Sequence, residues 1–156
     1  MLAINIYLTF NGCCEKAFIF YRTILGGHFE KIIRYKDIPD HNISAESKMD
    51  GPKIAFILLV IENTIIIGRD LKSKQFAPTG QYTVIRTSSK KEAEKLFYKF
   101  TDKGGEILIH LAYTLWGDYL GIVKDPYNIE WMILYDQKLN TRNDLFEQFY
   151  KNYFIN

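Results

Sequence analysis

The residues best suited to contact a small molecule lie on strand-like segments at the start of each half of the chain. In segments 5–10 and 82–87, every second side chain points to the same side of the predicted strand. If one side packs on a helix, the other can line a ligand site, where aromatic rings contact apolar groups and an arginine attracts an anion. With one tryptophan from a turn and one methionine from the last strand, the candidate ligand-binding residues are Tyr7, Thr9, Tyr82, Arg86, Trp116 and Met132.

Two of these residues have a second interpretation. Arg86 could lie on the surface or in an interface, and Trp116 could belong to a core or an interface. A buried guanidinium is costly without a partner, so in the ligand-site interpretation a bound anion or Glu130 must pair with Arg86. The other tryptophan, Trp131, alternates onto the side that faces a helix and is predicted to be core.

The residue types assign no catalytic group, no metal ligands and no cofactor. The three histidines, His28, His41 and His110, fall at a strand start, in a loop and at a strand end. Nothing in the sequence brings them together, whereas a metal held by nitrogen and oxygen ligands needs about three of them. There is also no glycine-rich strand–loop–helix that could hold a nucleotide-like cofactor. We therefore predict that the protein uses neither a metal nor a cofactor.

The two cysteines, Cys13 and Cys14, are adjacent. Neighbouring Cα atoms are about 3.8 Å apart, less than the usual minimum of about 4.4 Å for a disulfide, so a bridge between them would be strained. A place in the first turn of a helix could lower a thiol pKa and make it reactive. The alternative is that they are two small residues at a helix start.

The elements that must position the candidate residues occur twice, as two βαβββ modules. The first helix lies within 12–27 and the second spans 90–103; each ends at a glycine pair, a typical helix stop. Ser89 and Glu92 are predicted to form a capping box at the second helix. The apolar faces of the helices repeat with the same spacing, as Ala17, Phe20, Tyr21 and Ile24 and then Ala93, Leu96, Phe97 and Phe100.

The strands complete this pattern. A long polar loop at 36–53 and an aromatic turn at 113–117 interrupt it, and a third helix is predicted at 141–154, outside the duplication. The predicted strands are 5–10, 28–35, 54–61 and 64–70 in the first module, and 82–87, 106–111, 118–124 and 129–135 in the second.

The composition is that of a globular chain with a core. Of its 156 residues 47% are hydrophobic and 24% are charged, and the net charge of +2 comes from interspersed residues. Without a basic face we expect no nucleic-acid partner. The longest apolar run, 54–61, is far below the roughly 20 residues that cross a bilayer, so we expect no membrane span. No export signal is visible, and we expect a cytoplasmic protein.

Several short segments occur in a characteristic order, YLTFNG (7–12), IGRD (67–70), KKEAEKLF (90–97), TLWG (114–117) and D-x5-WM (125–132). Over roughly residues 4–136 the chain thereby resembles the PhnB-like branch of the vicinal oxygen chelate superfamily, which includes glyoxalase I, extradiol dioxygenases and bleomycin-binding proteins. The resemblance implies paired βαβββ modules that form a cup-shaped sheet, commonly in dimers. Relatives are often labelled as methyltransferases, but no site for a nucleotide-like methyl donor is present here.

The resemblance also implies where a metal would bind. Superfamily enzymes hold a divalent ion with ligands from the first and last strands of each module, which fall here at about Asn5, Ile66, Tyr82 and Met132. Neither these residues nor the neighbours reached by a slip of one position carry an imidazole or a carboxylate. Those neighbours are Ile6, Ile67, Thr83 and Ile133.

These observations predict an α+β fold with two paired βαβββ modules forming a cup-shaped, mostly antiparallel sheet, plus a C-terminal helix. A single domain, 1–137, would contain module 1 (1–70) and module 2 (80–137), and a helical tail would follow at 138–156. The predicted function is metal-free binding and sequestration of a small amphiphilic or aromatic molecule by a homodimer. The alternatives are a metal-dependent lyase or dioxygenase with a non-standard site, and a dimeric scaffold with a vestigial pocket.

Overall fold

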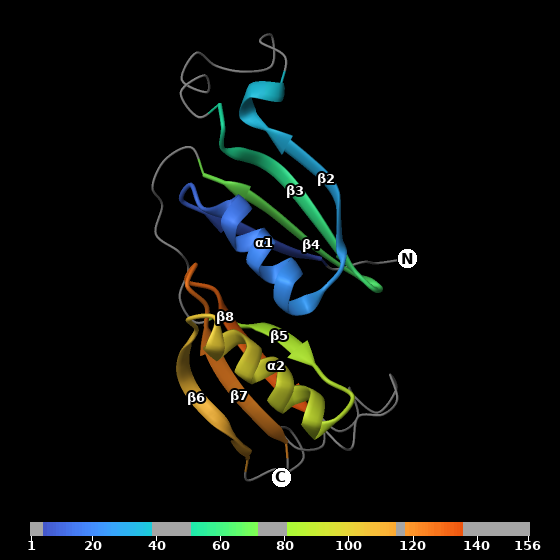
Figure 1. The fold of residues 1–156 in the computed structure, drawn as a ribbon, viewed down its shortest axis with the longest axis vertical. Coiled ribbons are helices and arrows are strands. Elements are labelled where there is room, and N and C mark those ends of the chain that lie inside the picture. Colours follow the sequence, from blue (N-terminus) through green and yellow to red (C-terminus); the bar gives the residue numbers. More distant parts are fainter. Residues whose placement is uncertain (1–4, 39–50, 72–80, 115–117, 136–156) are drawn as a thin grey trace, which may run out of the picture. The chain divides into compact units, whose positions relative to one another are not determined.

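A computed structural model describes residues 5–38, 51–71, 81–114 and 118–135 of the chain (Figure 1). The chain divides into two compact units, Met1–Gly80 and Gln81–Asn156, which are described one at a time. Most of the predicted loop 36–53, the tip of the aromatic turn with Trp116, and the predicted tail helix lie outside the described residues.

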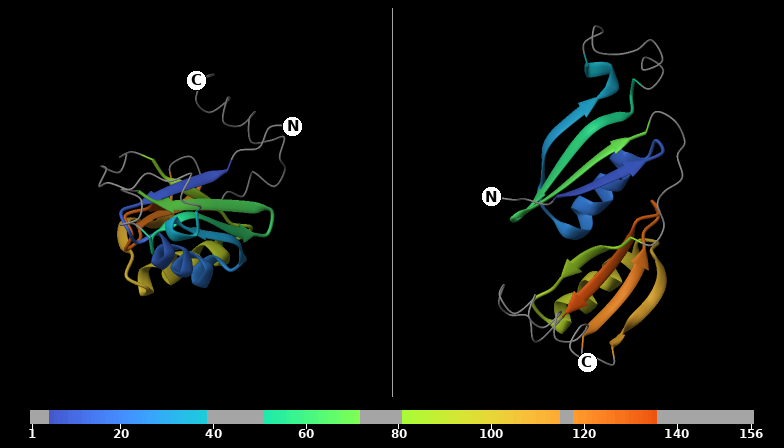
Figure 2. Two further views of the ribbon diagram at one scale, coloured as in Figure 1. Left: turned by 90° about the horizontal axis from the view of Figure 1, so that it is seen from above. Right: turned by 180° about the vertical axis from the view of Figure 1, so that it is seen from behind.

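Unit 1 is one βαβββ module. Its sheet has the strand order β1-β4-β3-β2, in which β1 and β4 run parallel and the other neighbours run antiparallel. One helix, α1, lies along one face of this sheet, and the view from behind in Figure 2 shows the strands of the unit in front of it. Its elements are β1 (Ile6–Phe10), α1 (Cys14–Leu25), β2 (His28–Arg34), a 3-10 turn η1 (Tyr35–Asp37), β3 (Ile54–Ile61) and β4 (Thr64–Asp70).

Unit 2 repeats the module, and its described residues contain no 3-10 turn. The strand order is β5-β8-β7-β6, again with one parallel pair, β5 and β8. The predicted α+β class is therefore confirmed, whereas the cup depends on how the modules pair and stays a prediction. The elements of unit 2 are β5 (Thr83–Arg86), α2 (Lys90–Asp102), β6 (Glu106–Tyr113), β7 (Tyr119–Lys124) and β8 (Glu130–Tyr135).

The core of unit 1 lies between α1 and its sheet. Phe18 packs directly on Gly68 of β4, where an added Cβ would collide with the phenyl ring. The predicted helix face is therefore wrong in one position, because Phe18 is buried and Phe20 is only half-buried. The buried side chains of α1 are Cys14, Ala17, Phe18, Tyr21 and Ile24.

The core of unit 2 is built in the same way around α2. The rings of Phe100 and Trp131 lie 5.4 Å apart, which confirms the prediction that this tryptophan is core. Its indole Nε1–H donates a hydrogen bond of 2.8 Å to the buried carboxylate of Asp125. That carboxylate also accepts bonds from the backbone N–H groups of Tyr127 and Ile129. These contacts give the D-x5-W spacing a structural reason, since the aspartate orders the turn before β8 and orients the tryptophan.

The helix starts differ from the predicted caps. The Ser89 side chain accepts a bond from the Glu92 N–H, as expected, but the Glu92 carboxylate accepts from the N–H and hydroxyl of Ser88. The predicted capping box is therefore wrong in one partner, because Glu92 bonds to Ser88 and not to the backbone N–H of Ser89. At α1 no local side chain caps the helix, and a residue from β4 does so instead, as described below.

The strands follow the predicted ranges closely, with one clear extension. The strand β6 continues to Tyr113 rather than ending at residue 111, because Thr114 and Asp118 continue the backbone pairing with β7 through a hydrogen bond of 2.7 Å. His110 consequently lies within the strand instead of at its end. The glycine stops are confirmed at Gly26, Gly27 and Gly104, which have φ angles of 82°, 84° and 93°.

Candidate ligand-binding faces

Each sheet has a far face, defined here as the face turned away from the helix of the same unit. In unit 1 the position of Gly68 against Phe18 fixes the helix side of β4. Its neighbours in the strand, Ile67 and Arg69, therefore belong to the far face. Strand pairing adds their partners from β1, which are Tyr7 opposite Ile67 and Thr9 opposite Arg69.

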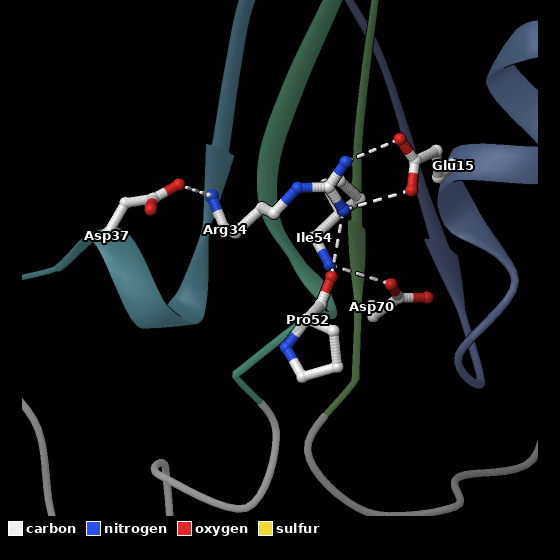
Figure 3. Close-up of polar contacts among 6 residues, drawn as sticks. All are labelled: Glu15, Arg34, Asp37, Pro52, Ile54 and Asp70. Atoms are coloured by element: carbon white, nitrogen blue, oxygen red, sulfur yellow. Dashed lines mark hydrogen bonds and ion pairs between the residues drawn. The ribbon is translucent and has the colours of Figure 1, made fainter.

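Asp70 anchors the end of β4 on the helix side. Its carboxylate accepts hydrogen bonds from two backbone N–H groups, those of Cys14 at 3.0 Å and Ile54 at 2.9 Å. Figure 3 shows the second of these bonds. The backbone carbonyl of Asp70 accepts a further hydrogen bond from the hydroxyl of Tyr35. One buried aspartate thus caps α1, fixes the start of β3, and directs the preceding residue, Arg69, to the far face.

A second polar network joins β2 to the start of α1. The guanidinium of Arg34 donates two hydrogen bonds to the carboxylate of Glu15 and a third to the carbonyl of Pro52, and the Asp37 carboxylate accepts from the Arg34 N–H (Figure 3). The bonds from Arg34 lower the pKa of Glu15 from its ordinary value. All of these groups hold the unit together, so we assign the network to structure rather than to ligand binding.

The far face of unit 2 follows from the position of Trp131. Because that residue packs on α2, its neighbour Met132 points away from the helix, together with its register partner Val84 on β5. Arg86, two residues further along β5, lies opposite Leu134 and is exposed.

The structure places most of the predicted ligand-binding residues on the far faces. Tyr7 and Thr9 lie on that of unit 1, and Arg86 and Met132 on that of unit 2. Tyr82 lies directly before β5 and is 46% exposed, close to the 49% of Tyr7. Trp116 lies outside the described residues.

Two details of the predicted site change. The register partner of Arg86 on β8 is Leu134, and Glu130 lies four residues away from it, opposite Lys124 of β7. An ion pair between Glu130 and Arg86 is therefore not supported. Sequence reasoning also missed Arg69. The alternation of β4 contained the signal, but the register with β1 was needed to place this arginine beside Thr9.

Among the described residues, we assign no catalytic role to a cysteine or a histidine. Cys14 is fully buried, and its burial raises the pKa of the thiol, with the charge of Asp70 adding to this effect. For Cys14 this favours the alternative, a small residue at a helix start, over a reactive thiol. Of the histidines, His28 lies 3.4 Å from Glu30 on β2, His110 is exposed on β6, and His41 is outside the described residues.

The far faces do not fit a divalent metal. Of the positions at which superfamily ligands were expected, Ile66 faces α1 and is 2% exposed, so its far-face neighbour is Ile67. Neither that residue nor Tyr82 or Met132 is an imidazole or carboxylate ligand. In the described ranges no three side chains of His, Cys, Asp or Glu gather where they could hold an ion. The metal-free state stays a prediction.

Comparison with known proteins gives consistent results. The model of the glyoxalase/bleomycin resistance protein/dioxygenase superfamily matches residues 3–133. Protein YjdN of Escherichia coli (strain K12) is 26% identical over 133 residues, which cover 81% of this chain and 90% of that protein. The crystal structure of protein PA1353 from Pseudomonas aeruginosa is 28% identical, with a TM-score of 0.75, and the match covers 87% of this chain and 98% of that one.

A more distant structure shows the same fold. It is the PhnB protein from Bacillus cereus, described as a putative 3-demethylubiquinone-9 3-methyltransferase. It is 19% identical, with a TM-score of 0.67, and the match covers 86% of this chain and all of that one.

Neither α1 nor α2, the helices of the described part of this chain, is long and apolar enough to cross a membrane.

Proposed function

Because the chain belongs to the glyoxalase/bleomycin resistance protein/dioxygenase superfamily, we propose that it is a PhnB-like member that binds a small amphiphilic or aromatic molecule. In this proposal the molecule is held on the far face of a unit without a metal ion, and the protein sequesters it unchanged. The match to YjdN and the fold of the Bacillus cereus PhnB protein support the choice of branch.

One observation carries the proposal. The parallel strand pair of unit 1, and that of unit 2 together with the residue before β5, present an exposed aromatic side chain beside aliphatic ones and an arginine. Among the described residues these faces carry no set of metal ligands. Aromatic rings such as Tyr7 and Tyr82 offer large apolar contact areas with a polar tip. A guanidinium in such a setting favours an anionic or carbonyl end on the ligand. The chemistry suits binding better than hydrolysis or oxygen activation.

A thermal-shift screen of aromatic acids and quinone-like compounds tests ligand binding. A ligand bound only by the folded state raises stability by RT ln(1 + [L]/Kd), so a hit raises the melting temperature of the wild type. The shift should shrink in Arg86→Ala and in Trp116→Ala. It should persist in Lys16→Ala, which removes an exposed charge from α1. Equal shifts in all four proteins would exclude Arg86 and Trp116 from the site, and no shift in the wild type would favour the scaffold alternative.

Two further measurements separate binding from catalysis. Elemental analysis of dialysed protein should find no stoichiometric zinc, iron, manganese or nickel. Recovery of the hit compound after prolonged incubation, followed by NMR, should return it unchanged. About one metal per chain, or conversion of the compound when one of these metals is added, would support the metal-dependent enzyme instead.

A further inference from the structure

Each unit carries an arginine on its far face, at the same position in its parallel strand pair. A rung is here a pair of residues that lie opposite each other on the two strands. The pairing of β1 with β4 starts at Ile6 opposite Ile66, and its fourth rung joins Thr9 to Arg69. The pairing of β5 with β8 starts at Thr83, and its fourth rung contains Arg86. The arginine lies on the inner strand in unit 1 and on the outer strand in unit 2.

The surroundings of Arg69 leave its charge available. The side chain is exposed, and the carboxylate next to it in the chain, that of Asp70, is bound on the helix side to two backbone N–H groups. Within the described residues the guanidinium makes no ion pair or hydrogen bond. The remaining far-face residues of β1 and β4 are uncharged; they are Tyr7, Thr9, Ile65 and Ile67.

We infer that the far face of unit 1 binds the carboxylate of an aromatic or aliphatic monoacid through Arg69. A guanidinium can hold a carboxylate with two parallel hydrogen bonds, and the hydroxyl of Thr9 on the same rung can donate another. The ring of Tyr7 and the side chain of Ile67, one rung away, provide the apolar contact for the body of the ligand. A single positive charge on this strand pair matches a monoanion.

This inference rests on the proposed function and adds to it the charge class of the ligand and the residue that recognises it. The sequence pattern alone pointed to Arg86. Arg69 is the stronger candidate to bind the anion, because the carboxylate of the adjacent Asp70 is bound to backbone N–H groups on the helix side. The two arginines belong to different units, so their contributions can be measured separately.

The test uses two probes of similar shape, 1-naphthoate and the neutral 1-naphthalenemethanol, with full-length protein and isothermal titration calorimetry. Wild type, Arg69→Met, Arg86→Met and Lys16→Met are compared, and thermal midpoints confirm that each variant is folded. We expect Arg69→Met to weaken naphthoate binding about tenfold or more, since charge-assisted hydrogen bonds are lost. Binding of the alcohol should change little. Lys16→Met, which removes one positive charge from α1, should leave both probes unaffected.

Three results would overturn the inference. If Arg69→Met binds naphthoate as tightly as the wild type, the carboxylate is held elsewhere, and a loss confined to Arg86→Met would assign it to unit 2; the proposed function would stand in both cases. If Arg69→Met weakens the binding of both probes equally, the arginine does not recognise the negative charge of the carboxylate. If the wild type binds neither these probes nor any compound of the thermal-shift screen, the proposed function fails as well.

Discussion

Asp70 shows how much of unit 1 depends on a single side chain. It is 2% exposed, and its two carboxylate oxygens accept from the N–H groups of Cys14 and Ile54. Asparagine keeps one acceptor oxygen but points an amide donor at the second N–H. We therefore expect Asp70→Asn to lower the free energy of unfolding by about 2–3 kcal/mol, because one buried donor loses its partner. Urea denaturation measures this change.

The matched control for this variant is Asp102→Asn, at the exposed last position of α2. It makes the same chemical change without a buried partner and should stay within about 0.5 kcal/mol of the wild type. If the two variants are equally stable, the bonds of Asp70 do not contribute as the structure suggests.

The ion pair of Glu15 and Arg34 should make the stability of the protein depend on pH. Hydrogen bonds from Arg34 lower the pKa of Glu15 in the folded state. The contribution is therefore complete above the unfolded-state pKa, about 4.3, and is lost as the pH falls through the lower folded-state pKa. Because the Glu15 side chain is 44% exposed, we expect Glu15→Gln to cost only about 0.5–1 kcal/mol at pH 7.

Denaturation curves of the wild type and Glu15→Gln between pH 7 and 2.5 test this prediction. The difference in unfolding free energy should be constant near neutral pH and shrink in the acid range. Glu62→Gln, in the exposed turn between β3 and β4, is the control and should differ little from the wild type at any pH. A difference for Glu15→Gln that persists at pH 2.5 would contradict the assignment.

Sequence alternation was sufficient to place several site residues. It put Tyr7 and Thr9 on one side of β1, because a strand has a period of two. It could not place Arg69 beside Thr9, or Asp70 beside the start of α1. Those neighbours are about sixty residues apart in the chain and meet only through the register of β1 with β4.

At the scale of elements, the end of α1 offers a sharp test of backbone geometry. Gly26 and Gly27 both have positive φ, but an added Cβ at Gly26 meets nothing within 4 Å, whereas at Gly27 it would collide with the backbone carbonyl of Val60. Gly26→Ala should therefore cost about 1–3 kcal/mol for its backbone conformation alone, because φ 82° and ψ −155° lie in a region that essentially only glycine adopts. Gly27→Ala should cost about 1–3 kcal/mol more, because the steric overlap adds to that strain.

Chemical denaturation of the two alanine variants, with m-values compared to confirm two-state unfolding, measures the difference. Gly26→Ala serves as the control for Gly27→Ala, since it introduces the same residue at nearly the same φ. Equal losses of stability in both variants would show that β3 moves away from the turn without cost.

The elements themselves were predictable where local signals were strong. The alternation and turn residues gave β3 and β4 their observed bounds, and Ser89 marked the start of α2. Local signals failed where a distant strand decides the outcome. The packing of Phe18 against Gly68 selects this ring over Phe20 for the core, and pairing with β7 extends β6 to Tyr113.

For the whole molecule we predict a homodimer. In the described sheets β2 and β6 are outer strands, and β6 exposes three consecutive apolar side chains, Ile107, Leu108 and Ile109. An outer strand with apolar side chains favours pairing with another chain. Light scattering at micromolar concentration should give twice the 18.3 kDa of one chain. Ile109→Lys on β6 should shift the equilibrium toward the monomer, while Ile19→Lys on the exposed side of α1 should not.

The buried thiol of Cys14 has a practical consequence for following the opening of unit 1. Neither cysteine is in a disulfide. Cys13 is half-buried, whereas Cys14, the first residue of α1, is fully buried against β4, where its raised pKa keeps the thiol protonated. Ellman's reagent should therefore label Cys13 first, and Cys14 only as fast as the surrounding structure opens. The slow phase should accelerate in Asp70→Asn and disappear in urea, where both thiols react together. The rate at which Cys14 is labelled therefore reports the local unfolding of unit 1 and can be followed by absorbance alone. A single fast phase for both thiols in the native protein would contradict this prediction.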